Sequence, residues 1–193
     1  MMNKYSLIFF FLLLIVMLSA CGEKYEGDFK YEVQDFSYTN QDGETINKSN
    51  DLDGKFWVAD FIFTNCDTVC PPMTANMARL QTQLNEAGLD DVQLVSFSAD
   101  PENDTQEALK QFGEEHQASF DNWDFLTGYE FDEIKEFSVK SFKSPLEEIA
   151  DSDQLLHSVR FFLVSPEGNA IKMYDGRKPA EMELIVEDIQ NMQ

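Results

Sequence analysis

Two of the three cysteines of this chain, Cys66 and Cys70, stand in the stretch FTNCDTVCPPM. Positions i and i+4 lie on one face of a helical turn, so the two sulfurs are close enough to share a metal ion or to form a disulfide. The start of a helix lowers a thiol pKa and favours the thiolate, which is both the nucleophile and the metal ligand. The pair by itself therefore leaves metal binding and redox chemistry open.

A metal site needs more than two thiolates, and the chain has two histidines. His116, in GEEHQAS, follows a predicted helix among glutamates, which is typical of a solvated surface histidine. His157, in DSDQLLHSVRFFLV, stands just before a predicted apolar strand. Taken alone it could be a partly buried histidine bonded to backbone; together with the two cysteines it is a candidate third ligand.

Two thiolates and one imidazole suit copper, because the sulfurs accept Cu(I) and the added nitrogen makes Cu(II) acceptable. Zinc is the rival, since Cys2His with an open fourth position is a known catalytic zinc set. The nearest obvious acids, Asp100 and Asp104, are predicted to be turn and helix-cap residues. Met73 and Met77 are further soft donors, but their spacing indicates helix packing.

The chain begins with a segment that is typical of a secreted protein. Lys4 precedes an apolar run from Leu7 to Leu18, and the residues LSA before Cys21 resemble a bacterial lipobox. Twelve helical residues cover only about 18 Å of a roughly 30 Å hydrocarbon core, so a spanning anchor is the weaker interpretation and a soluble secreted protein is weaker still. We expect a signal peptide over 1–20 and a lipid-attached tether over 21–35.

This reading places the protein on the extracytoplasmic face of the cell membrane, held there by lipid on Cys21. Only Cys66 and Cys70 then remain as thiols. A structural disulfide is common outside the cytoplasm, although a loop of three residues between cysteines gains little from chain entropy.

Length and charge bound the rest of the chain. With 193 residues and 43% apolar content, it is long enough for one domain, which we place at 36–193. The 14 Lys and Arg stand against 36 Asp and Glu, a net charge of −22, so binding to nucleic acid is excluded on electrostatic grounds.

The predicted elements follow an α/β order with a central mixed sheet flanked by helices, a thioredoxin-like layout with an added N-terminal β-hairpin. In this layout the cysteine loop lies at the C-terminal end of a central strand, and the segment before the apolar strand of His157 faces it. The expected elements are a hairpin at 36–47, strands at 56–64, 92–98 and 124–128, helices at 73–89, about 105–116 and 129–139, two strands around 166–168, and a final helix from about 179.

The sequence resembles the Sco/SenC family, whose members are thioredoxin-fold copper proteins that are anchored to membranes. CDTVCPPM matches the family's CxxxCP, FSADPENDT matches its S-x-DPxxDT stretch, and His157 before RFFLVSPEGN matches its distal histidine. The resemblance covers the chain from about Phe36 to its end, and it rests on three motifs in the right order.

The resemblance implies that Cys66, Cys70 and His157 are copper ligands, for Cu(I) or Cu(II), in a metallochaperone that assembles the copper A centre of cytochrome c oxidase. Asp100 and Asp104 match the family's paired aspartates, which could support the ligands from behind. The implied partners are the copper A-bearing oxidase subunit, a thiol reductant of the extracytoplasmic space, and the membrane.

The alternative is an enzyme, a thiol-disulfide oxidoreductase whose Cys66–Cys70 pair reduces the copper-ligand cysteines of the oxidase subunit. A thioredoxin-like peroxidase is a weaker third interpretation, because the Thr and Arg setting of a peroxidatic thiolate is not evident. Thioredoxin-like oxidoreductases carry a proline opposite their cysteines, where this chain has Leu155, Leu156 and His157. That difference favours copper binding over general oxidoreduction.

Overall fold

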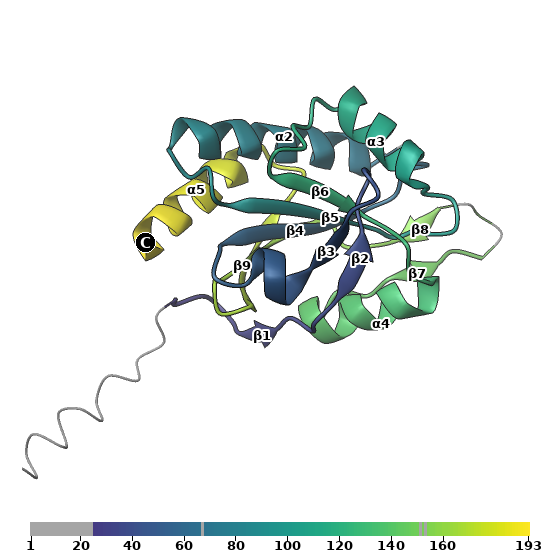
Figure 1. Ribbon diagram of the computed structural model, residues 1–193, viewed down its shortest axis with the longest axis horizontal. Helices are drawn as coiled ribbons and strands as arrows, with labels where there is room; N and C mark the ends of the chain where they lie inside the picture. The colour runs from purple at the N-terminus through teal and green to yellow at the C-terminus, as the bar shows by residue number, and fades with distance from the viewer. Residues whose placement is uncertain (1–24, 67, 151, 153) are drawn as a thin grey trace, which may run out of the picture.

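The structure, a computed structural model, describes residues 25–66, 68–150, 152 and 154–193. Its centre is a six-stranded mixed sheet in the order β1-β10-β9-β4-β5-β6 (Figure 1). β5 is parallel to β4 and to β6, whereas β9 runs antiparallel to β4 and to β10. The strands are β1 (Tyr31–Glu32), β4 (Trp57–Ile62), β5 (Gln93–Ser98), β6 (Trp123–Leu126), β9 (Arg160–Val164) and β10 (Asn169–Asp175).

Helices cover both faces of this sheet. α2 and α5 pack together on one face and α4 lies on the other (Figure 1). The central strand β4 is therefore buried at every residue, as its apolar run predicts for a strand covered on both sides. The helices are α2 (Cys70–Glu86), α3 (Gln106–Glu115), α4 (Phe131–Phe142) and α5 (Ala180–Met192), with a short π-helix, η2 (Lys48–Leu52).

Aromatic rings fill the core beneath α4. The Phe97 ring lies 5.1 Å from that of Phe137 and 5.4 Å from that of Phe61, measured between centroids. Phe36, which precedes the hairpin β2 (Ser37–Thr39) and β3 (Thr45–Asn47), meets Phe97 edge to face. The predicted hairpin is thus confirmed, and its first aromatic residue ties it to the main core.

The chain joins the fold before residue 36. β1 pairs with β10, and the Tyr25 ring packs edge to face on Phe56, just before β4 begins. The folded part therefore reaches into the segment 21–35 that we expected to be a tether. The predicted signal peptide and Cys21 lie outside the described residues. Within the described chain, none of the helices has the length and apolar character to cross a membrane.

Two local predictions differ from the structure. α2 begins at Cys70 rather than near Met73, with Pro71 and Pro72 in its first turn, where a missing N–H costs nothing. The residue that caps α3 is Thr105, whose side chain accepts a hydrogen bond from the backbone N–H of Ala108, so the prediction of Asp104 as a helix cap is wrong. A second hairpin, β7 (Glu147–Glu148) with β8 (Leu155–Leu156), was not predicted.

Candidate metal centre

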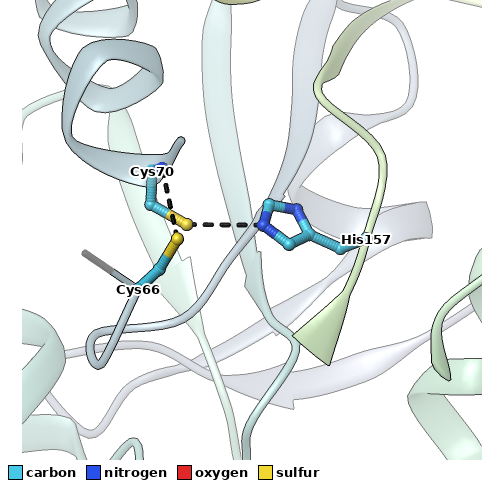
Figure 2. A group of neighbouring side chains, drawn as sticks. All are labelled: Cys66, Cys70 and His157. Carbon is cyan, nitrogen blue, oxygen red and sulfur yellow. Dashed lines mark hydrogen bonds between the residues drawn. The ribbon is translucent and has the colours of Figure 1, made fainter. Parts of the chain in front are cut away.

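Three side chains converge where β4 ends: Cys66, Cys70 and His157 (Figure 2). One ligand atom from each lies within 4.8 Å of the other two, and the Cys70 Sγ is 3.5 Å from the His157 Nε2. Both cysteines are free thiols. Among the described residues, no other set of three or more His, Cys, Asp or Glu side chains lies close enough together to hold a metal ion.

Cys66 and His157 are 91 positions apart in the sequence, and the pairing of β4 with β9 brings them together. Because the two strands are antiparallel, the loop that leaves β4 lies beside the segment that leads into β9. Cys66 lies in that loop, and its Sγ accepts a hydrogen bond from the backbone N–H of Cys70, the first residue of α2, over 3.4 Å. His157 lies in the segment before β9, as the sequence predicts.

His157 is oriented on both sides of its ring. Its Nδ1 lies 3.0 Å from the carbonyl oxygen of Ser158, and its Nε2, on the other side of the ring, faces the Cys70 Sγ. The Phe63 ring meets the imidazole edge to face, with 5.5 Å between centroids. The imidazole nitrogen that faces the thiols is therefore the one suited to bind a metal.

The two thiols differ in acidity. Burial opposes ionisation of Cys66, but hydrogen bonds with His157 and Cys70 outweigh it and lower the pKa to about 6. Burial raises the pKa of Cys70 well above its usual range, and the neighbouring Cys66 and the Asp60 carboxylate raise it further. At neutral pH the metal-free site therefore holds one thiolate and one thiol, and a metal that binds both sulfurs displaces a proton from Cys70.

Asp104 holds the start of the cysteine loop. It is fully buried, its Oδ1 accepts hydrogen bonds from the N–H and the hydroxyl of Thr64, and its Oδ2 accepts one from Ser98. Burial raises the pKa of Asp104 against these hydrogen bonds. Asp100 is a turn residue, as predicted: its carbonyl accepts from the N–H of Asn103 and its carboxylate from the Asn103 amide.

A second buried acid, Asp60, was missed in the sequence. It lies in the middle of β4, is fully buried, and its Oδ1 accepts a hydrogen bond of 2.6 Å from Ser96. Its Oδ2 has no hydrogen-bond partner in the described part of the chain. Burial raises the pKa of Asp60 to about 7, although Ser96 and His157 act in the opposite direction. A charged residue inside a strand predicted to be covered on both faces was the available signal.

The remaining candidates lie away from the donor group, although His116 is partly buried rather than the solvated surface histidine that its sequence predicts. His116 ends α3, its Nδ1 is 2.8 Å from the Phe112 carbonyl, and its ring lies on that of Phe112. Met73 and Met77 are fully buried in the core. The mixed sheet, the cysteine at the first turn of α2 and the facing histidine define a thioredoxin-like protein with a Cys2His donor cluster.

A comparison with known sequences shows to which family the chain belongs. The protein-family model described as SCO1/SenC matches residues 25–193, and the chain belongs to that family. The SCO1 protein homolog of Bacillus subtilis is 44% identical over 180 residues, which cover 93% of this chain and 92% of the homolog.

Solved structures of the family agree in fold. A SCO1/SenC family lipoprotein from Bacillus anthracis is 43% identical, with a TM-score of 0.80 over 84% of this chain and 95% of that one. BsSco, with a disulfide switch and described as a cytochrome c oxidase assembly protein, is 46% identical, with a TM-score of 0.78 over 87% and 97%. Arabidopsis thaliana ScoI with copper bound is 28% identical, with a TM-score of 0.69 over 82% and 98%.

The unequal acidity of the thiols predicts selective alkylation. In the reduced chain without residues 1–24, we expect Cys66 to react with iodoacetamide faster than Cys70 at pH 7, with a rate that reaches half its plateau near pH 6. His157→Ala should move that midpoint to higher pH, because it removes a hydrogen bond to the thiolate. Peptide mass spectrometry measures both rates, and a Cys66 midpoint equal to that of the denatured chain would contradict the assignment.

The raised pKa of Asp60 predicts that the stability of the fold depends on pH. Because its pKa is raised in the fold, the folded chain keeps a proton that the unfolded chain loses between about pH 4 and 7, so the free energy of unfolding falls as pH rises through this window. Over this window the free energy of unfolding falls by at most ~4 kcal/mol. Asp60→Asn, which cannot ionise, should show a smaller decline in urea unfolding experiments at pH 5 and pH 8. Equal declines in the two proteins would refute the raised pKa.

Proposed function

We propose that this protein binds copper through Cys66, Cys70 and His157 and delivers it to the copper A centre of cytochrome c oxidase. The observation that carries the proposal is the donor set itself, two sulfurs and one imidazole nitrogen within 4.8 Å of one another. Soft thiolates select copper, and the imidazole allows both Cu(I) and Cu(II). The copper-bound relative and the relative described as an oxidase assembly protein support the same function.

Copper is the cargo of this protein, so the site must also release it. Cys66 is a thiolate at neutral pH and Cys70 binds its proton strongly, so protonation of Cys70 weakens the hold on the metal. The ligand thiols must be reduced before they bind copper, which calls for a thiol reductant in the extracytoplasmic space. The acceptor is the copper A-bearing subunit of the oxidase, whose own ligands take the metal by exchange.

We place the protein at the cell membrane, with the domain on the extracytoplasmic face and lipid on Cys21. The lipobox-like LSA before Cys21 and the apolar run before it support this location. The family member from Bacillus anthracis that is described as a lipoprotein supports it as well. The signal peptide over 1–20, the tether that follows it and the single domain to residue 193 belong to the same proposal.

Of the two aspartates, the contacts favour Asp104 as the residue that supports the ligands. Its carboxylate fixes Thr64, two residues before Cys66, and joins it to the end of β5 through Ser98. Asp100 acts through the turn that places Asp104, since its carbonyl accepts from the N–H of Asp104 over 2.8 Å. Neither carboxylate belongs to the group of three donors.

A second candidate function is reduction of a disulfide formed by the acceptor's copper-ligand cysteines. The lowered pKa of Cys66 favours it, because a thiolate near its pKa at ambient pH is an effective attacking group in thiol-disulfide exchange. The buried Cys70, four residues on, would then close the disulfide with Cys66. The two functions differ in what passes to the acceptor, metal or electrons.

Copper titration of the reduced chain tests the proposal. We expect one copper per chain, with absorption from thiolate-to-Cu(II) charge transfer and release of at least one proton. His157→Ala should weaken Cu(II) binding about 10- to 100-fold and shift the absorption, because it removes the nitrogen ligand. A wild-type chain that binds copper no better than the Cys66→Ser, Cys70→Ser control, yet reduces the acceptor disulfide, would replace delivery by the second function.

Loss of the Asp104 carboxylate tests its supporting role. Asp104→Ala leaves the Thr64 N–H and the hydroxyls of Thr64 and Ser98 without their acceptor, so we expect copper affinity to fall about tenfold and the free energy of unfolding to fall by about 1–3 kcal/mol. Asp104→Asn, which keeps an acceptor oxygen, should recover much of both. Asp100→Asn is the matched control. An equal loss of copper affinity in this control would show that the effect comes from the loss of a negative charge near the site and not from the hydrogen bonds that Asp104 accepts.

A further inference from the structure

The cysteine sulfurs can be reached from only a small part of the surface. Cys70 is fully buried and Cys66 is 5% exposed, whereas His157 is partly exposed. The Gln154 amide donates a hydrogen bond to the backbone carbonyl of Asn65 and so ties the β7–β8 hairpin to the cysteine loop. His157 is thus the donor most open to a partner, and the hairpin that Gln154 ties to the cysteine loop directly precedes it in the chain.

A cavity of about 500 Å³ lies between the cysteine loop and this hairpin. It lies beside Asn65, the neighbour of Cys66, and is bounded by the turn at 100–103, by Phe131 at the start of α4, and by Glu148 and Leu155 of the hairpin. This volume is within the range of cavities that accept small ligands or a few side chains of another protein. The cavity thus adjoins the cysteine loop at Asn65, and none of the three donor residues lines it.

The charge of the cavity is negative. Asp100, Glu102 and Glu148 line it, and its described lining includes no lysine, arginine or histidine. On the same hairpin Glu147 forms an ion pair with Lys135, whereas Glu102 and Glu148 form no ion pair within the described residues. These carboxylates do not meet the spacing of a metal site. Their field favours a cationic side chain of a partner.

The hairpin also exposes apolar side chains. Ile149, next to β7, is 45% exposed and Leu156, at the end of β8, is 54% exposed. Five large apolar side chains of the described chain are exposed to this extent, and two of them belong to this hairpin: the full set is Val139, Ile149, Leu156, Met173 and Leu184. In the β7–β8 register Glu147 pairs with Leu156 and Glu148 with Leu155, so Leu156 lies on the face of the hairpin opposite the cavity-lining pair Glu148 and Leu155. The cavity itself is therefore bounded by the more polar face of the hairpin.

We infer that the acidic cavity beside Asn65, with the side of the β7–β8 hairpin that lines it, forms the docking surface for the copper acceptor, and that the acceptor presents a lysine or arginine to the cavity. This inference rests on the proposed function, because it names the surface through which that function reaches its partner. Docking here places the acceptor beside His157, the most exposed of the three candidate ligands.

Charge reversal tests this surface in the full lipidated chain, held in phosphatidylcholine vesicles. The probe is the reduced, metal-free copper A domain of the oxidase, and its Kd is measured at low and at physiological salt. Glu102→Lys with Glu148→Lys should raise the Kd at least about tenfold and remove most of its salt dependence. Leu156→Ser, on the face of the hairpin opposite the cavity, should leave the Kd unchanged.

The matched control is Glu86→Lys with Glu187→Lys, which makes the same charge change on exposed positions of α2 and α5. Glu86 is 16 residues along α2 from Cys70, about 24 Å away. An equal rise in Kd in this control, or a wild-type chain that does not bind the acceptor, would overturn the docking surface.

Copper titration of the same variants separates the two proposals. The Glu102→Lys, Glu148→Lys protein should bind copper as the wild type does, because neither residue belongs to the donor group. If the wild type docks with the acceptor but carries no copper to it, delivery fails while the docking surface stands. If copper still passes and the double charge reversal leaves the Kd unchanged, the docking surface fails while delivery stands.

Discussion

The candidate metal centre depends on the antiparallel pairing of β4 with β9. Trp57 pairs with Val164 and Ala59 with Phe162, and this register sets which residues meet beyond the end of β4. A shift of one residue would turn each side chain of the strand to the opposite face. The complete burial of β4 makes such a shift costly, so the fold itself sets the separation between the cysteine loop and His157.

The surroundings of the site give two chemically similar thiols different states. Cys66, in the loop, is stabilised as a thiolate by its neighbours, and Cys70, in the first turn of α2, is kept protonated mainly by burial. Asp60 adds negative charge beneath the pair when it ionises. A site built in this way favours a ligand that supplies positive charge, since a bound cation stabilises both thiolates and the buried carboxylate together.

Two kinds of feature could be predicted from the sequence: elements with a strong hydrophobic pattern, and ligands that the order of strands and helices places side by side. The run FWVADFIFT predicts β4, and the α/β order places His157 opposite the cysteines before any contact is known. The β7–β8 hairpin escapes prediction because each strand has two residues, too few for an alternating pattern. For Asp104 the local pattern and the family resemblance disagree: an acid just before a helix suggests a cap, whereas the resemblance implies a residue that supports the ligands, and packing turns the side chain inward to Thr64.

The contact between Tyr25 and Phe56 has a consequence for how far the protein can reach. Phe56 stands before the first residue of β4 and Cys66 stands after the last, so the six-residue strand separates the start of the described chain from the donor group by roughly 20 Å. With lipid on Cys21, as we propose, only a few residues lie between the bilayer and that contact. The short tether would then set an upper limit on the height of the donor group above the lipid surface, and a membrane-bound acceptor must offer its copper ligands within that limit.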